Sequence, residues 1–349
     1  MDKPDCAWQL ADLKTVQKNG VKVMSTFACG GGSSMGYKRT GCEIVAANDI
    51  DPEMAWHYKH NLNPPNYYLC PIRDLITADL PPELFKLDIL DGSPPCSTFS
   101  MAGSREKSWG KDKHFREGQA KQVLSDLFFD YLDLVERLKP KVAIAENVKG
   151  MIIGNAKGYT KLVMARFKEI GYRVQLFLVN AADCGVPQRR ERVFFCAIRD
   201  DIKAAPLELK PQHRWITAGE ATADLQVLTA EEKKDTEPDL TANRYWKGTT
   251  PGENFAEECN RKTGKASCFT NVRLSEKQPA STLSSQAHTV THWSECRKLT
   301  FREWKRLGSF PDDYHAKTDK IGKYMVGMSV PPKMTEAVAR AVITQWLEA

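Results

Sequence analysis

The sequence lacks the features that mark several classes of protein. None of its apolar runs approaches the roughly 18–20 residues that cross a bilayer. The N-terminal segment has no apolar core of the kind that directs secretion. The chain also contains no internal repeat and no low-complexity tract. We therefore expect a cytoplasmic protein with no membrane partner.

Metal-binding and phosphate-binding patterns are equally scarce. Five residues of types that bind zinc lie late in the chain: Cys259, Cys268, His288, His292 and Cys296. The close pair among them is His288 and His292, and the cysteines are not closely paired. Zinc sites usually contain closely spaced cysteine pairs, so we predict no metal site. Without a secretion signal, the ten cysteines should be mostly reduced thiols. The glycine-rich turn near residue 30 lacks a Gly-Lys-Ser/Thr ending, which excludes a P-loop.

Charge and composition narrow the class only modestly. Lysine and arginine outnumber the acids by 50 to 44, for a net charge of +6. This balance permits a polyanionic partner without demanding one. The hydrophobic share of 42% is typical of a globular chain, and 349 residues suffice for one large domain and one small one.

Short apolar runs alternate with helical patterns over the first two hundred residues. We predict buried strands at 21–27, 43–47, 87–90, 141–145, 174–179 and 193–198. An amphipathic helix is predicted from Val123 to Leu138, where Pro140 stops it. A last helix begins at Pro331-Pro332 and places Met334, Val338, Val342 and Trp346 on one face. This alternation indicates a doubly wound α/β domain with a mostly parallel sheet.

The pattern of apolar and polar residues changes near residue 204. From there to about 295 the periodicity is weak and prolines are scattered among polar residues. We predict a cofactor-binding and catalytic domain at 1–203, a small separate domain at 204–295, and a segment at 296–349 that returns to the first domain.

A glycine-rich turn follows the first predicted strand, from Phe27 to Gly36. Glycines there let the backbone turn tightly and approach a ligand near a helix N-terminus. Asp49 ends the second strand about 20 residues later, where doubly wound folds place an acceptor for ribose hydroxyls. The turn predicts a nucleotide-type cofactor, although such a turn can also be purely structural.

Three further segments carry candidate chemistry at strand ends. Pro94-Pro95-Cys96 follows a buried strand, at the edge where open α/β sheets bind ligands. Glu146 ends the next apolar strand, a costly place for a carboxylate without a partner or a task. Arg190 and Arg192 alternate before the strand at 193–198, and arginine suits fork-like contacts to carbonyl or phosphate oxygens. Taken singly, these residues could also be a buried thiol, a paired acid and a solvated edge.

Taken together and in order, the motifs resemble the DNA cytosine-5 methyltransferase family along almost the whole chain. The resemblance rests on the glycine turn and on the following elements: Pro95-Cys96, Glu146-Asn147-Val148, Gln188-x-Arg190-x-Arg192, Arg302-Glu303 with Arg306-Leu307 and Phe310-Pro311, Gly327-x-Ser329-Val330, and Pro279 to Leu283. No single motif is unique to the family, but coincidence of the whole ordered set is very improbable.

The resemblance implies a fold, a reaction and a set of residues. The fold is a Rossmann-like methyltransferase domain with a small variable target recognition domain, and the protein acts as a monomer on double-stranded DNA. Catalysis falls to Cys96, which adds to C6 of a flipped-out cytosine, with Glu146, Arg190 and Arg192. Binding of the cofactor S-adenosylmethionine is implied for Phe27, Cys29, Gly31, Gly32, Asp49, Ile50, Pro94, Leu127 and Ser329. Contacts to DNA are implied for Ser97, Arg105, Lys107, Gln188 and Thr282.

The residues from Ser97 to Gln119 form a polar, basic stretch. We expect it to close over the flipped base and to contact phosphates. The alternative is a basic loop with no such role.

Some positions depart from the family pattern. Cys29 stands where the family has the first glycine of the turn, and its Cβ could crowd the cofactor. Cys70-Pro71-Ile72 replaces the usual acidic residue after the third strand. Met328 precedes Ser329 where asparagine is common, and Ser97 replaces a frequent glutamine.

Two other functions remain open on the sequence alone. A transfer-RNA cytosine-5 methyltransferase would use the same motif order, and Cys268-Phe269-Thr270 resembles a tripeptide of that branch. A catalytically inactive DNA-binding relative is the other, although Cys96, Glu146 and Arg192 are intact.

Overall fold

The computed structural model describes residues 3–95, 112–113, 122–123, 127–154 and 156–348. The chain divides into two compact units, each assembled from separated stretches. The sheet unit comprises Thr15–Val179, Glu191–Pro211 and Thr335–Ala349. The second unit comprises Met1–Lys14, Asn180–Arg190 and Gln212–Met334, and we call it the recognition unit after the role expected for residues 204–295. The domain limits predicted near residues 204 and 296 stay a prediction.

A seven-stranded sheet organises the first unit, in the order β3-β2-β1-β4-β7-β9-β8. Pairing is parallel from β3 through β7 and antiparallel between β7 and β9. The strands are β1 (Lys22–Thr26), β2 (Glu43–Asp49), β3 (Tyr67–Leu69), β4 (Ile89–Gly92), β7 (Val142–Val148), β8 (Tyr172–Asn180) and β9 (Glu191–Arg199). The mostly parallel Rossmann-like fold predicted from the sequence is confirmed.

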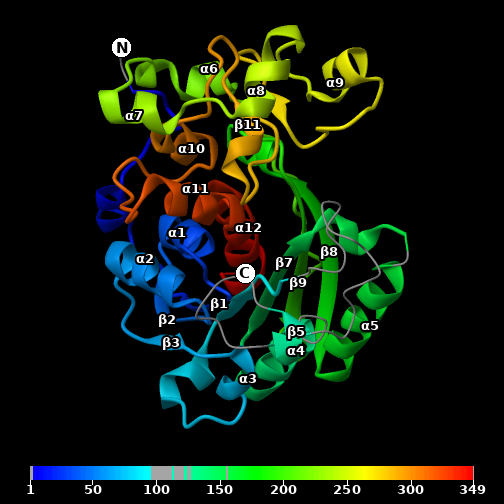
Figure 1. Ribbon diagram of the computed structural model, residues 1–349. Helices are drawn as coiled ribbons and strands as arrows, with labels where there is room; N and C mark the ends of the chain where they lie inside the picture. The colour runs from blue at the N-terminus through cyan, green and yellow to red at the C-terminus, as the bar shows by residue number, and fades with distance from the viewer. Residues whose placement is uncertain (1–2, 96–111, 114–121, 124–126, 155, 349) are drawn as a thin grey trace. The chain divides into compact units, whose positions relative to one another are not determined.

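Helices flank this sheet, as Figure 1 shows, with α1 and α2 beside its β1–β3 half and α4 and α5 beside its β7–β9 half. They are α1 (Gly32–Arg39), α2 (Pro52–Leu62), α3 (Ile72–Leu75), α4 (Leu127–Leu138), α5 (Ala156–Glu169) and α12 (Pro332–Val342). The α4 helix buries an almost continuous apolar face, including Phe128, Tyr131 and Leu132, in the main core. The apolar periodicity of 127–138 therefore comes from packing onto the sheet.

The recognition unit is built from short helices and two small strands. These are α6 (Ala218–Ala221), α7 (Ala230–Asp235), α8 (Leu240–Tyr245), α9 (Ala256–Thr263), α10 (Phe301–Leu307), α11 (Asp319–Met328), β10 (Val272–Arg273) and β11 (Val290–Thr291). Capping boxes start α6, α7 and α10, with Thr217, Thr229 and Thr300 as the N-caps. The weak periodicity of this region reflects helices too short to carry a long apolar stripe.

The six predicted strands and the last helix are confirmed, but one helix boundary is wrong. The spacing of apolar residues placed Val123 in a helix, whereas Gln122–Val123 pairs with Asp112–Lys113 as β6 and β5. The described helix begins at Leu127 and ends at Leu138, just before Pro140. In the part of the chain that the structure describes, every helix is too short or too polar to cross a bilayer.

Candidate active site

The turn that follows β1 has a backbone shape that few residue types adopt. Phe27, Cys29 and Gly31 have positive φ angles of 51°, 46° and 84°. A Cβ on Gly31 would lie 2.3 Å from Leu62 Cδ1, so both conformation and space require glycine there. Gly32 then begins α1 and is buried. The segment predicted to bind the cofactor is thus a tight turn at the carboxyl end of β1.

The carboxylate of Asp49 supports this turn from the neighbouring strand. Its Oδ2 accepts a hydrogen bond from the backbone N–H of Cys29 at 2.7 Å, and its Oδ1 accepts one from Asp51 at 2.9 Å. Burial raises the pKa of Asp49, and the backbone hydrogen bonds act in the opposite direction. A carboxylate has about four lone-pair sites, so Asp49 keeps capacity for ligand hydroxyls. Asp49 and Ile50 therefore lie beside the turn, as a shared cofactor site requires.

A second polar atom lies near Asp49. The Tyr67 hydroxyl on β3 is buried and has no hydrogen-bond partner among the described residues. Burial and then the charge of Asp49 raise the pKa of Tyr67, which keeps the phenol neutral. Sequence reasoning missed this tyrosine because it lies in a short strand whose partner could not be predicted.

The structure shows the contacts made at two positions that depart from the family pattern, Cys29 and the segment after β3. The thiol of Cys29 lies 3.7 Å from the Met54 sulfur of α2, so this side chain packs against a helix. After β3, the Asn48 side-chain amide donates to the carbonyls of Tyr68 and Cys70 at 2.9 and 2.8 Å. The segment that lacks an acidic residue is therefore still anchored to the end of β2.

Glu146 and Arg192 meet across the antiparallel pair β7–β9. Arg192 lies opposite Val148 in the register, and its Nε is 2.9 Å from Glu146 Oε1. Glu146 is buried, and burial lowers the pKa of Arg192 while Glu146 raises it. Arg192 Nη1 donates to the carbonyl of Glu191, which leaves Nη2 without a partner among the described residues. The pair thus places a carboxylate beside a guanidinium whose Nη2 makes no hydrogen bond to the described residues.

The neighbouring Asn147 anchors the strand end that leads to Cys96. Its side-chain nitrogen donates to the Pro94 carbonyl at 3.0 Å, and its oxygen accepts from the Val148 N–H at 2.9 Å. Asn147 is buried. The Glu-Asn-Val element thus contacts the Pro-Pro-Cys element directly, a relationship that sequence reasoning did not predict.

Asp91 is the other polar residue that sequence reasoning missed. It is 3% exposed and lies inside β4 between apolar neighbours. An acid in an otherwise apolar strand is the signal that could have found it, by the argument already applied to Glu146.

Several predicted residues belong to the recognition unit and stabilise its backbone. Gln188 accepts from the Leu283 N–H at 3.0 Å and donates to the Leu307 carbonyl at 3.2 Å. Arg190 donates to the carbonyls of Leu283 and Gly327 at 2.8 and 3.0 Å. The exposed Thr282 hydroxyl donates to a backbone carbonyl at position 189, at 2.8 Å.

Ser329 ends α11 in the same unit. Its hydroxyl is buried and has no partner among the described residues. Its predicted role toward the cofactor stays a prediction.

Most of the remaining predicted residues lie in parts of the chain that the structure does not describe, and one lies at the start of a described range. Cys96, Ser97, Arg105 and Lys107 lie outside the described residues, as does most of the stretch from Ser97 to Gln119. Leu127 is buried at the first turn of α4.

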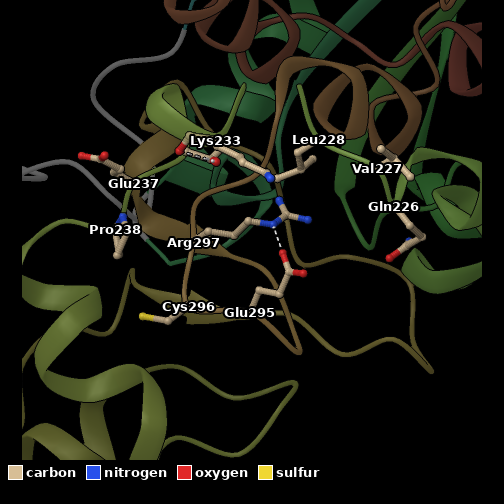
Figure 2. A pocket seen from close by; sticks show the side chains of 10 residues that line it. Gln226, Val227, Leu228, Lys233, Glu237, Pro238, Glu295, Cys296 and Arg297 are labelled. Atoms are coloured by element: carbon tan, nitrogen blue, oxygen red, sulfur yellow. Dashed lines mark hydrogen bonds and ion pairs between the residues drawn. The ribbon is translucent and has the colours of Figure 1, made fainter. Parts of the chain in front are cut away.

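A separate hollow lies within the recognition unit, with a volume of about 560 Å³. Figure 2 shows Arg297 at its centre, bonded to Glu295. Arg297 also bonds Glu303 at 2.7 and 2.8 Å, so its charge is compensated inside the unit. Among the described residues no group of three or more histidine, cysteine or acidic side chains is arranged to hold a metal ion.

Comparisons with known proteins agree on one family. The model of the family described as C-5 cytosine-specific DNA methylase matches residues 21–344. Type II methyltransferase M.NgoPII of Neisseria gonorrhoeae is 30% identical, over 93% of this chain and 96% of that protein. Type II methyltransferase M.FnuDI of Fusobacterium nucleatum is 27% identical, over 92% and 94%.

Solved structures share the fold at lower identity. A prophage-encoded E. coli protein described as a DNA modification methyltransferase has a TM-score of 0.70 at 19% identity and covers 95% of this chain and 100% of its own. A DNMT2 variant from Spodoptera frugiperda has a TM-score of 0.62 at 18% identity, with 93% and 100% covered.

Proposed function

The chain belongs to the C-5 cytosine-specific DNA methylase family, and we propose that it carries out this S-adenosylmethionine-dependent reaction with the residues described above. The cofactor, when bound, supplies a methyl group on a positively charged sulfur. C5 of cytosine is too weak a nucleophile to take that methyl unaided. The protein must therefore activate the base, and the proposal assigns this task to Cys96, Glu146 and Arg192.

Cys96 is proposed as the nucleophile. Its thiolate adds to C6 of the base, which turns the ring into an enamine with electron density at C5. After the methyl is transferred, C5 loses its proton and the C6–S bond breaks, which releases Cys96 and the product. The hydrogen bond from Asn147 to the Pro94 carbonyl supports this assignment, because it fixes the backbone two residues before the nucleophile.

Glu146 and Arg192 are proposed to hold the flipped base while the charge on it changes. The Glu146 carboxyl, when protonated, donates to the ring at N3, where negative charge develops as the thiolate adds. The Nη2 of Arg192 donates to the O2 carbonyl of the base. Their ion pair at 2.9 Å is the observation that carries the proposal, since it keeps a carboxyl group that can carry the proton for N3 beside a guanidinium donor for O2 before substrate arrives. Arg190 is proposed to act indirectly, through the backbone of Leu283 and Gly327.

The cofactor is proposed to bind at the turn after β1. The turned backbone from Phe27 to Gly32, the spare acceptor capacity of Asp49 and the unpartnered Tyr67 hydroxyl all fit a ligand with ribose hydroxyls and an amino-acid end. Pro94, Leu127 and Ser329 complete the proposed set. Gln188 and Thr282 are proposed on the DNA side, with Ser97, Arg105 and Lys107.

The proposal extends to setting and assembly. The named relatives are Type II methyltransferases, which supports a role in DNA modification in the cytoplasm. We further propose that the protein acts as a monomer on double-stranded DNA. The domain plan predicted from sequence is proposed with its limits near residues 204 and 296.

Label transfer from tritiated S-adenosylmethionine tests the function. Purified protein is incubated separately with unmethylated genomic DNA and with transfer RNA, and the labelled base is identified after hydrolysis. We expect label in DNA as 5-methylcytosine and none in RNA. Label only in transfer RNA would replace the proposed substrate. No label in either, with the cofactor still bound, would favour an inactive relative.

A further inference from the structure

The carboxylate of Asp91 joins three elements at the base of the cofactor turn. Its Oδ2 accepts from Ser33 Oγ of α1 at 2.7 Å and from Ser25 Oγ of β1 at 3.0 Å. Its Oδ1 accepts from the Tyr37 hydroxyl at 3.0 Å. Four side chains from β1, α1 and β4 therefore meet at one buried charge.

These four side chains connect the cofactor turn with the strand that leads to Cys96. Ser25 comes two residues before Phe27, where the cofactor turn begins, and Ser33 comes directly after Gly32, where it ends. Asp91 also lies on the strand that leads to Pro94 and Cys96, and its carbonyl accepts from the Thr26 hydroxyl at 2.9 Å. A change at this carboxylate would reach both segments.

Within the described residues the Asp91 carboxylate forms no ion pair with lysine, arginine or histidine. The titratable groups that face it are Tyr37 from α1, Tyr58 from α2, Tyr131 from α4 and Glu146 from β7. Burial raises the pKa of Asp91 to about 6, although three hydroxyl donors act against this rise. A buried acid that is costly to ionise calls for a role other than stability.

We propose that Asp91 is a positioning residue whose ionised carboxylate holds the cofactor turn in the shape that binds S-adenosylmethionine. This inference rests on the proposed function and deepens it. The ionised form accepts from all three hydroxyls at once. Protonation turns one acceptor oxygen into a donor, so at least one of the three hydroxyls must change from donor to acceptor, and the charge-assisted hydrogen bonds that hold α1 and β1 become weaker.

The inference predicts how cofactor affinity depends on pH. Only the ionised form is binding-competent, and the apparent dissociation constant scales inversely with its fraction. With a pKa of about 6 for Asp91, that fraction is about one-tenth at pH 5. We expect the dissociation constant for S-adenosylmethionine to rise about tenfold between pH 7.5 and pH 5.

Equilibrium dialysis of the full-length protein against labelled S-adenosylmethionine between pH 5 and pH 8 tests this inference. The variant Asp91→Asn has nearly the same shape but cannot ionise, so it mimics the protonated state. The dissociation constant of this variant for S-adenosylmethionine should be high at every pH and should not change near pH 6. The cofactor's own titration is common to both proteins and cancels in the comparison.

Asp88→Asn is the matched control. Asp88 lies three residues earlier, just before β4, and holds the Lys22 N–H at 2.8 Å and the Lys141 ammonium at 2.8 Å. It makes no contact with the turn among the described contacts, so its variant should keep the wild-type affinity and pH dependence. If Asp91→Asn fails to fold, Ser33→Ala removes one donor, and it should weaken binding at pH 7.5 and move the midpoint of the pH dependence upward, because the Ser33 hydrogen bond lowers the pKa of Asp91.

The outcomes separate this inference from the proposed function. Wild-type protein that does not bind S-adenosylmethionine at pH 7.5 would contradict the proposed function. Wild-type binding with the same affinity and pH profile in Asp91→Asn would overturn the role of Asp91 alone.

Discussion

Arg192 Nε lies 2.9 Å from Glu146 Oε1, and this ion pair joins the end of β7 to the start of β9. Both side chains are largely removed from water, with 15% and 10% of their surfaces exposed. A buried pair is weak evidence for stability, because desolvation offsets much of the attraction. The proposed function gives the pair a further role, since it holds a carboxyl group and a guanidinium donor in fixed positions.

Glu146→Gln should therefore lower kcat by about 10²–10⁴, the range for a lost acid–base group. The amide retains the shape of the side chain, so DNA affinity should change little. Single-turnover methylation assays and filter binding measure the two quantities. Glu191→Gln is the matched control, because Glu191 pairs with the exposed Lys149 at 2.8 Å and such pairs contribute little. Equal losses in the two variants would contradict the assignment of Glu146.

Asn147→Asp should separate positioning from cofactor binding. The substitution keeps the acceptor for the Val148 N–H but removes the donor to Pro94, and it places a carboxylate oxygen against a carbonyl. A buried group left unsatisfied costs about 1–3 kcal/mol. We expect a lower melting temperature and a much lower kcat, with a smaller loss of S-adenosylmethionine affinity, because Pro94 also belongs to the proposed cofactor set. A loss confined to cofactor affinity would show that Asn147 acts elsewhere.

Cys29→Gly tests the departure in the cofactor turn. Cys29 has φ of +46°, a conformation that costs a non-glycine residue about 1–2 kcal/mol. Glycine removes this cost and loses only the contact with the Met54 sulfur at 3.7 Å. The melting temperature should rise, and cofactor affinity should stay the same, because the side chain packs against α2. A fall in melting temperature would show that the sulfur contact outweighs the strain.

Asp91 should make stability depend on pH in an unusual direction. Burial raises the pKa of Asp91 from 3.8 to about 6, so between these values the native state binds more protons than the unfolded state. The stability due to the protonated form is present at acid pH and is lost as the pH rises through about 6. Relative to Asp91→Asn, the wild type should gain about 1.4 kcal/mol between pH 7.5 and pH 5. Urea unfolding of both proteins at each pH measures this difference. If the difference in unfolding free energy between the two proteins did not change with pH, the pKa of Asp91 would be the same in the folded and unfolded states.

Local patterns were enough to predict much of the fold and part of the site. Apolar runs marked the strands, and residues at their carboxyl ends, such as Asp49 and Glu146, were predicted because parallel strands place those ends at one edge. The alternation of arginines indicated Arg192, although its distance to Glu146 depends on the antiparallel register of β7 and β9.

Contacts between distant segments were not predictable in the same way. The Trp8 indole donates to the Ser309 carbonyl at 2.9 Å, across 301 residues, which ties the N-terminal segment to the recognition unit. The bond from Asn147 to Pro94 spans 53 residues and has no sequence signature. The helix expected at Val123 was wrong because a segment this short does not reveal whether its apolar residues follow the period of a strand or of a helix.

Trapping of the protein on DNA tests the central claim, that Cys96 attacks the base. DNA amplified with 5-fluoro-2′-deoxycytidine triphosphate carries fluorine at C5, which cannot leave as a proton after methyl transfer, so the C6–S bond cannot break. The account predicts a covalent protein–DNA complex that survives denaturing electrophoresis, requires S-adenosylmethionine, and maps to Cys96 by peptide mass spectrometry. It also predicts no such complex with Cys96→Ala. A complex that forms equally in Cys96→Ala, or methylation of ordinary DNA by that variant, would contradict it.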